Sequence, residues 1–161
     1  MKLDMKLAKV VFENPLNVCD PAAHKPNLLH ASEMDWKPLQ GEKGASITAM
    51  PHGLMRVLLV GDPNLPGLSI FRLKYPAHYR VPPHVHWMAE HSSVLEGSVY
   101  IGFGDKFDEN NLVKFTAGDF FSVPVGMPHY VLTKEESPIF EFHVIGPWQI
   151  DYCNPDEHPH E

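Results

Sequence analysis

The 161-residue sequence has little cysteine and no run of basic residues. Its two cysteines, Cys19 and Cys153, lie near opposite ends, so they form neither a disulfide framework nor a zinc-binding cysteine pattern. Such isolated thiols are typical of a reducing compartment. There are 13 Lys and Arg against 20 Asp and Glu, which gives a formal net charge of −7. An acidic chain without a basic patch is not expected to bind nucleic acid.

Long apolar segments are missing as well. No stretch reaches the roughly 18 apolar residues that a membrane-spanning helix needs, so we expect no membrane association. Residues Met1 to Phe12 mix lysines and an aspartate among apolar residues, and this segment lacks the continuous apolar region of a signal peptide. We therefore expect a cytoplasmic protein, or a secreted one if a leader has been removed.

Proline, in contrast, is frequent: 16 residues are spread along the chain. This distribution disfavours long helices and favours short strands joined by turns. Short apolar segments rich in β-branched residues occur between Gly, Pro and Asn turns, and the strands expected from them are 54–60, 68–75, 93–103, 120–125, 129–133 and 139–145. Strands of this length and spacing predict an all-β sandwich or barrel.

The first 45 residues have a different pattern. Met1, Leu3, Met5 and Leu7 alternate with polar residues, and prolines then interrupt the segment repeatedly. An apolar arm needs a surface to cover it. We therefore expect an N-terminal arm over 1–45 that packs on its own or a partner's barrel, a barrel over 46–153 and a polar tail over 154–161. Because of this arm, a homodimer is the expected assembly.

Histidine is the most unusual component, with 11 residues, six of them between positions 78 and 143. His84 and His86 are two residues apart, so on a strand both imidazoles project from the same face and can reach one ion. Glu90 follows four residues later and can add a carboxylate from the same side. This N,N,O donor set suits iron, manganese, nickel, zinc or copper. Taken alone, however, a histidine pair on a strand is weak evidence for a metal.

The spacing of residues around this pair is far more specific. The first segment has His-x-His, three residues, Glu, six residues and Gly, at positions His84, His86, Glu90 and Gly97. The second segment, further downstream, has Gly, five residues, Pro-x-Gly, two residues and His, at positions Gly118, Pro124, Gly126 and His129. These two segments resemble the paired motifs of the cupin family, over about residues 54 to 150. The likeness is closest to small one-domain cupins of largely unassigned function, whose recurring features are similar to 79–84, 104–108 and 146–148.

The resemblance implies a cupin double-stranded β-helix (jelly-roll) barrel. It also implies one divalent transition metal (Fe, Mn, Zn, Ni or Cu) whose ligands are His84, His86, Glu90 and His129. Two positions depart from the family pattern, since His78 stands where glycine is common and Thr133 where asparagine is common. Neither position is usually a ligand, so the implied metal site is unaffected.

A further histidine, His143, lies in the expected strand 139–145. There Glu141 and His143 share one face, while Phe140, Phe142 and Val144 share the other. If the polar face lines the barrel, His143 faces the substrate; if not, it lies on the exterior. We therefore retain Glu90 and His143 as candidate catalytic residues, with Glu90 able to detach and act as a base.

Three imidazoles and one carboxylate leave about two positions open on a six-coordinate ion. A small-molecule substrate and O₂ could occupy them. The first hypothesis is therefore a metal-dependent enzyme acting on a small organic molecule, with dioxygenase the leading subclass. The same donor set also serves isomerases and lyases, and a non-catalytic sensor or regulator is the alternative from a different class.

Overall fold

A computed structural model describes residues 27–39 and 50–157. The chain divides into two compact units, 1–33 and 34–161. In the first unit the described part contains the 3₁₀ helix η1 (Ala31–Glu33), closed by a hydrogen bond from Glu33 N to His30 O of 2.9 Å. No helix in the described ranges is long and apolar enough to cross a membrane. The alternating segment from Met1 to Leu7 lies outside the described residues, so the packing of the arm and the homodimer stay predictions.

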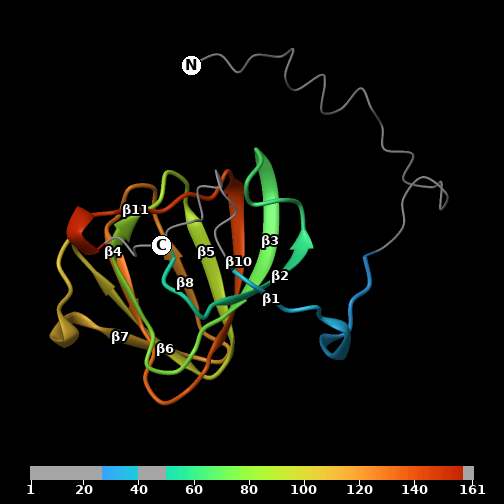
Figure 1. Cartoon of the computed structure of the whole chain (residues 1–161), viewed down its shortest axis with the longest axis horizontal. Coiled ribbons are helices and arrows are strands. Elements are labelled where there is room, and N and C mark those ends of the chain that lie inside the picture. Colours follow the sequence, from blue (N-terminus) through green and yellow to red (C-terminus); the bar gives the residue numbers. More distant parts are fainter. Residues whose placement is uncertain (1–26, 40–49, 158–161) are drawn as a thin grey trace, which may run out of the picture. The chain divides into compact units, whose positions relative to one another are not determined.

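The second unit consists of two antiparallel sheets (Figure 1). In spatial order, the six-stranded sheet contains β1 (Lys37–Pro38), β2 (Met55–Val60), β3 (Gly67–Lys74), β10 (Ile139–Gly146), β5 (Glu90–Glu96) and β8 (Phe120–Val123). The five-stranded sheet contains β11 (Asp151–Tyr152), β4 (Arg80–Val85), β9 (His129–Leu132), β6 (Ser98–Phe103) and β7 (Val113–Thr116). Two short 3₁₀ helices, η2 (Glu109–Asn111) and η3 (Pro155–Glu157), complete the unit. This arrangement confirms the predicted all-β jelly-roll barrel.

Alternation along the strands decides which side chains fill the space between the sheets. In β10, Phe140, Phe142 and Val144 are 1–3% exposed, whereas Glu141 is half-buried and His143 is exposed. A strand with one buried face shows this period of two, because successive side chains point to opposite sides of the sheet. The core is therefore aromatic and aliphatic, and the polar face of β10 lies outside the barrel.

Gly97 separates two strands that the apolar pattern predicts as one. The expected strand over 93–103 is wrong as a single element, because β5 ends at Glu96 in one sheet and β6 begins at Ser98 in the other. Gly97 has φ +68°, and a Cβ there would lie 3.1 Å from Pro138 Cα. Only glycine meets both conditions without strain. The chain thus crosses between the sheets at this residue.

Part of the segment predicted as an arm belongs to the six-stranded sheet. Strand β1 pairs with β2, with Lys37 opposite Arg56. Leu39 then donates its backbone N–H to Leu54 O at 2.8 Å, and its side chain joins the core at 8% exposure. Residues 37–39 therefore extend the edge of the six-stranded sheet.

The two departures from the cupin pattern meet at one turn. His78 adopts φ +55°, a left-handed conformation that suits the glycine common at this position. Beside it, the buried hydroxyl of Thr133 accepts a hydrogen bond from Tyr79 N at 2.8 Å and donates to Pro76 O at 2.6 Å. Thr133 thus holds both sides of the turn at His78, just before strand β4.

Candidate metal centre

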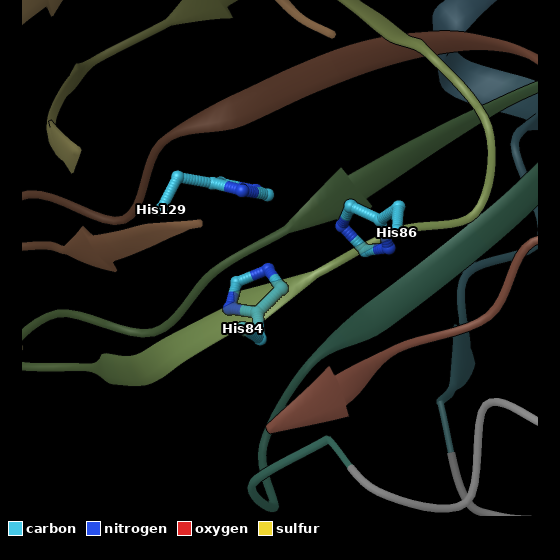
Figure 2. Close-up of side chains that lie close together, drawn as sticks. All are labelled: His84, His86 and His129. Carbon is cyan, nitrogen blue, oxygen red and sulfur yellow. The ribbon is translucent and has the colours of Figure 1, made fainter. Parts of the chain in front are cut away.

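Three histidines converge inside the barrel from two neighbouring strands. His84 lies in β4, and His86 is the first residue after that strand ends at Val85. His129 is the first residue of β9, where it pairs with His84 across the sheet. All three are only 2–3% exposed. Their ligating nitrogens lie within 4.8 Å of one another, and Figure 2 shows the rings grouped around a common space. The structure therefore brings together three of the four implied ligands as a buried triad.

Each ring of the triad is fixed through its Nδ1 atom by a backbone carbonyl. His84 Nδ1 lies 2.7 Å from Pro82 O, His129 Nδ1 lies 3.1 Å from Met127 O, and His86 Nδ1 contacts Gln149 O. A carbonyl oxygen can only accept, so Nδ1 carries the hydrogen in every case. When such a ring is neutral it presents the lone pair of Nε2, which is how histidine ligands are commonly oriented around a metal.

Glu90 reaches the triad from the opposite sheet. It is the first residue of β5 and is 3% exposed; its Oε2 lies 3.4 Å from His86 Nε2 and 3.6 Å from His129 Nε2. It thus adjoins two of the three histidines. Burial alone would raise the pKa of Glu90, but the positive charge of His86 and hydrogen bonds from both histidines outweigh it and lower that pKa. The carboxylate is therefore ionised inside the barrel.

The charge of this carboxylate is coupled to the protonation of the imidazoles around it. Burial, followed by the repulsion of His129 and His86, lowers the pKa of His84 well below its ordinary value. For His86, burial is outweighed by the charge of Glu90, which raises its pKa. An ionised carboxylate facing nitrogen lone pairs is costly in a dry interior unless a proton or a metal ion lies between them. Three imidazole nitrogens and one carboxylate oxygen fit a divalent transition metal.

The space beside the triad is small and mainly apolar. The cavity has a volume of about 20 Å³, which is room for about one water molecule. Apart from the triad and Glu90, the described lining residues are Met50, Tyr75, Val81, Ile101, Phe121, Val131, Phe140, Phe142 and Trp148. The Trp148 ring stacks on His86 at 5.6 Å. This lining keeps bulk water away from the four polar side chains.

His143 does not join this site. Its side chain is 47% exposed, and its Nε2 lies 3.1 Å from Glu141 Oε1 on the outer face of β10. The alternating pattern allows the polar face of β10 to lie inside or outside the barrel, and the structure shows it outside. His143 is therefore not retained as a candidate catalytic residue. The physical reason is that Phe140, Phe142 and Val144 fill the inner face.

Tyr75 is one of the pocket residues that the motifs do not identify. It directly follows β3, is 3% exposed and lines the same cavity as the triad. A signal for it was present, because Phe71, Leu73 and Tyr75 continue one period-two series and Phe71 and Leu73 are fully buried. Phe140 and Phe142 could have been placed in the pocket once the inner face of β10 was known.

The two sheets and the buried histidine triad between them place this protein among the jelly-roll barrels with a candidate metal centre. The family model described as Cupin matches residues 47–147. The chain belongs to the cupin family.

Relatives and solved structures agree with this assignment. The chain is 37% identical over 92 residues to "Putative germin-like protein 2-3" of Oryza sativa subsp. japonica, over 55% of this chain and 39% of that protein. It spans about two fifths of that relative's length. The polyketide cyclase RemF from Streptomyces resistomycificus has TM-score 0.60 at 17% identity, covering 83% of this chain and 90% of that one. A cupin-superfamily sugar phosphate isomerase from Silicibacter pomeroyi has TM-score 0.55 at 16% identity, with coverage of 74% and 75%.

Proposed function

We propose that this cupin is a metal-dependent enzyme that acts on a small organic molecule. One divalent transition metal (Fe, Mn, Zn, Ni or Cu) would be held by His84, His86, Glu90 and His129. The observation that carries the proposal is the shared anchoring of the three histidines. Each Nδ1 is tied to a backbone carbonyl, which leaves each Nε2 free to ligate. A set of histidines buried only for packing would not need this common orientation.

When bound, such a metal would supply Lewis acidity or, if redox-active, chemistry with O₂. Four protein ligands leave about two positions for other molecules, and this favours dioxygenase as the leading subclass. The chain's own contribution is to fix the imidazoles, keep Glu90 ionised and exclude water with an apolar lining. If Glu90 leaves its position, its carboxylate can accept a proton from the substrate.

The lining also limits the substrate class. No Lys or Arg lines the cavity among the described residues, so a phosphate or a second carboxylate would find no countercharge there. A sugar phosphate, the substrate class in the name of one structural neighbour, is disfavoured for this reason. Aromatic side chains such as Phe121, Phe142 and Trp148 favour a molecule with an uncharged, apolar body. It must be small, or side chains must move to admit it.

One observation favours a second candidate function. The cavity has room for about one water molecule, and the triad is almost completely buried. A site as closed as this suits a cupin that retains a metal or a small ligand as a sensor or regulator without catalysis. The two functions differ in turnover, which the oxygen-uptake measurement below tests.

Oxygen uptake by the iron-loaded protein tests the leading proposal. The probes would be small phenols, enols and diketones, each assayed with the wild type, His84→Ala and His143→Ala. We expect uptake that depends on the compound, persists in His143→Ala and is lost in His84→Ala, because only His84 belongs to the triad. Fully loaded protein that consumes no oxygen with any probe would contradict the dioxygenase subclass. Conversion of a probe without oxygen uptake would instead favour an isomerase or lyase.

A further inference from the structure

A separate, open cavity begins on the side of β4 that faces away from the metal centre. Val81 lines the triad's cavity, whereas its neighbour Arg80 lines this one, because adjacent side chains of a strand point to opposite faces. The volume is about 530 Å³, which suits a small molecule. The other lining residues follow β6 and β11, and they are 105–107, 153–154 and Glu157. None of these described residues lines the triad's cavity, so the two cavities are distinct.

The guanidinium group of Arg80 is held at the wall of this cavity from two sides. Its Nη2 lies 2.8 Å from Glu157 Oε1, and its central carbon lies 4.2 Å from the centre of the Phe107 ring. A cation over the face of an aromatic ring is attracted by the π electrons. Phe107 itself packs on the fully buried Tyr130, with ring centroids 4.9 Å apart. These contacts limit the positions that the guanidinium group can take.

The cations of this cavity have hydrogen-bond donors to spare. A guanidinium group carries several N–H donors, and in the described part of the chain Arg80 uses one of them, in its contact with Glu157. Lys106 lines the same cavity and has no hydrogen-bond or ion-pair partner among the described residues. The cavity therefore presents two positive groups that can receive an anionic oxygen.

The same lining also carries negative charge. Asp105 has no hydrogen-bond or ion-pair partner among the described side chains, whereas Glu157 is engaged with Arg80. Burial, followed by the charges of Asp105 and Glu157, raises the pKa of the Cys153 thiol, which therefore stays protonated and adds no charge. Arg80 and Lys106 thus face two carboxylates. A polyanion such as phosphate is repelled by these carboxylates, but a ligand with both signs of charge can satisfy Lys106 and Asp105 together.

We propose that this cavity binds a small amino acid, with its carboxylate at Arg80 and Lys106 and its ammonium group at Asp105. The planar fork of a guanidinium group matches the two oxygens of a carboxylate. Phe107 borders the same cavity and offers apolar surface to a short side chain. This binding site is independent of the proposed metal chemistry, since the two cavities share no lining residue among those described.

Nuclear magnetic resonance titration of the isotope-labelled protein provides the test, because it reports both the affinity and the place of binding. The probes are L-alanine, acetate, the ethylammonium ion and inorganic phosphate. We expect L-alanine to shift the backbone signals of 105–107 and 153–157. Acetate and ethylammonium each carry one half of the zwitterion, and their dissociation constants should be at least about ten-fold higher, as for the loss of one charged hydrogen-bonding group. Phosphate should also bind more weakly than L-alanine.

Two variants separate the two halves of the site. Arg80→Gln removes the charged fork, and we expect the dissociation constant of L-alanine to rise about ten-fold. Asp105→Asn should remove the preference for L-alanine over acetate while acetate still binds. Arg72→Gln is the matched control, since Arg72 also lies 2.8 Å from a glutamate oxygen but outside this cavity. It should leave the binding of L-alanine unchanged.

Several results would overturn this assignment. No binding of L-alanine at millimolar concentration, or shifts confined to signals outside 105–107 and 153–157, would remove the site. Acetate or phosphate that binds as tightly as L-alanine would remove the amino acid as the ligand class. Unchanged preference for L-alanine in a folded Asp105→Asn variant would have the same consequence, and it decides the matter even if Arg80→Gln does not fold. None of these results bears on the metal site, whose residues lie elsewhere.

Discussion

The histidines inside the barrel and those on its outer face have different hydrogen-bond partners. Inside, His84, His86 and His129 are anchored through Nδ1 by backbone carbonyls. Outside, His91 and His143 are cross-strand neighbours on β5 and β10, and they contact the side chains of Ser122 and Glu141. A carbonyl fixes a ring through the main chain, whereas a side-chain partner can rotate with it. Anchoring and burial, rather than the presence of histidine, therefore distinguish candidate ligands from surface residues.

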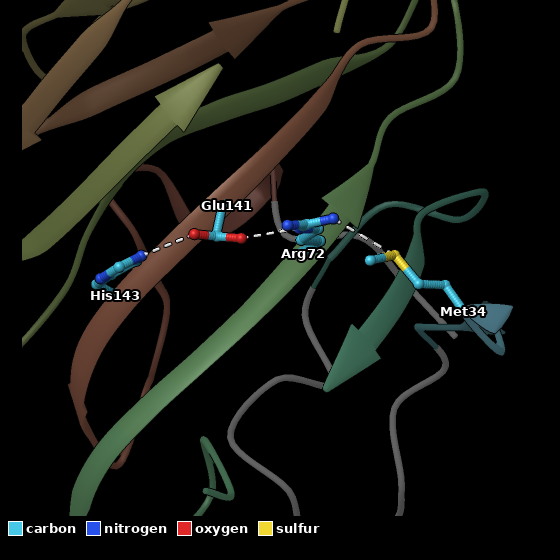
Figure 3. Close-up of polar contacts among 4 residues, drawn as sticks. All are labelled: Met34, Arg72, Glu141 and His143. Atoms are coloured by element: carbon cyan, nitrogen blue, oxygen red, sulfur yellow. Dashed lines mark hydrogen bonds and ion pairs between the residues drawn. The ribbon is translucent and has the colours of Figure 1, made fainter. Parts of the chain in front are cut away.

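His143 belongs to a polar network on the outer face of the six-stranded sheet (Figure 3). Arg72 Nε lies 2.8 Å from Glu141 Oε2, and an Arg72 N–H also contacts Met34 Sδ at 3.5 Å. Glu141 contacts His143 with its other oxygen. Burial would raise the pKa of Glu141, but hydrogen bonds from His143 and Arg72 outweigh it and lower that pKa. This network satisfies its charges by itself and needs no metal.

The largest contrast is expected between adjacent residues of β10 that face opposite sides. Phe142 is 3% exposed and stacks on Phe71 with ring centroids 5.4 Å apart. Phe142→Ala should lower the free energy of unfolding by about 3–5 kcal/mol through lost burial and a cavity. His143→Ala should cost less than about 1 kcal/mol, as for an exposed side-chain contact on the surface. Urea unfolding measures both, and equal losses would contradict the assignment of the two faces.

The strand pattern shows how far sequence could predict this site. The resemblance of two short segments to the cupin motifs implies the ligands His84, His86, Glu90 and His129, and the structure gathers these residues in one place. The alternation in β10 predicts two faces, but it cannot decide which one is buried. That choice depends on packing against the other sheet, so the sequence leaves the orientation of the His143 side chain open.

Long-range contacts explain the other gaps. The carbonyl that anchors His86 belongs to Gln149, 63 residues away, and no local pattern signals such a contact. The crossing at Gly97 is hidden because apolar residues continue on both sides of it. Tyr75 continues the buried series of β3, but its place in the wall of the triad's cavity becomes visible only in three dimensions.

Glu90 and Glu141 allow the inner and outer groups to be compared through one chemical change. Glu90→Gln keeps the shape of the side chain but removes its charge beside His86 and His129. We expect zinc affinity to fall by at least about 10- to 100-fold, the range seen when residues that only support the ligands are altered. Glu141→Gln should leave zinc affinity unchanged. Competition with a chromophoric chelator measures both, and a matching loss in Glu141→Gln would remove the distinction between the groups.

The smallest effect concerns pH and the outer network. Because the folded pKa of Glu141 lies below its ordinary value of 4.5, its ionised form stabilises the fold above that value. This contribution is lost as the pH falls through the folded pKa. Glu141 is 21% exposed, so Glu141→Gln should cost only about 0.5–1 kcal/mol at pH 7. In urea unfolding at several pH values the difference should shrink as the pH falls below 4.5; a difference independent of pH would contradict this role.

The central claim is that the inner histidines, and not the outer ones, hold a metal. The most direct test is the metal content per chain, measured by mass spectrometry on protein loaded with one metal and freed of excess. The wild type and His91→Ala should each retain about one ion per chain, and His84→Ala should retain almost none, because it removes a ligand from the buried triad. Equal metal content in His84→Ala and the wild type, or loss of metal in His91→Ala, would contradict the account.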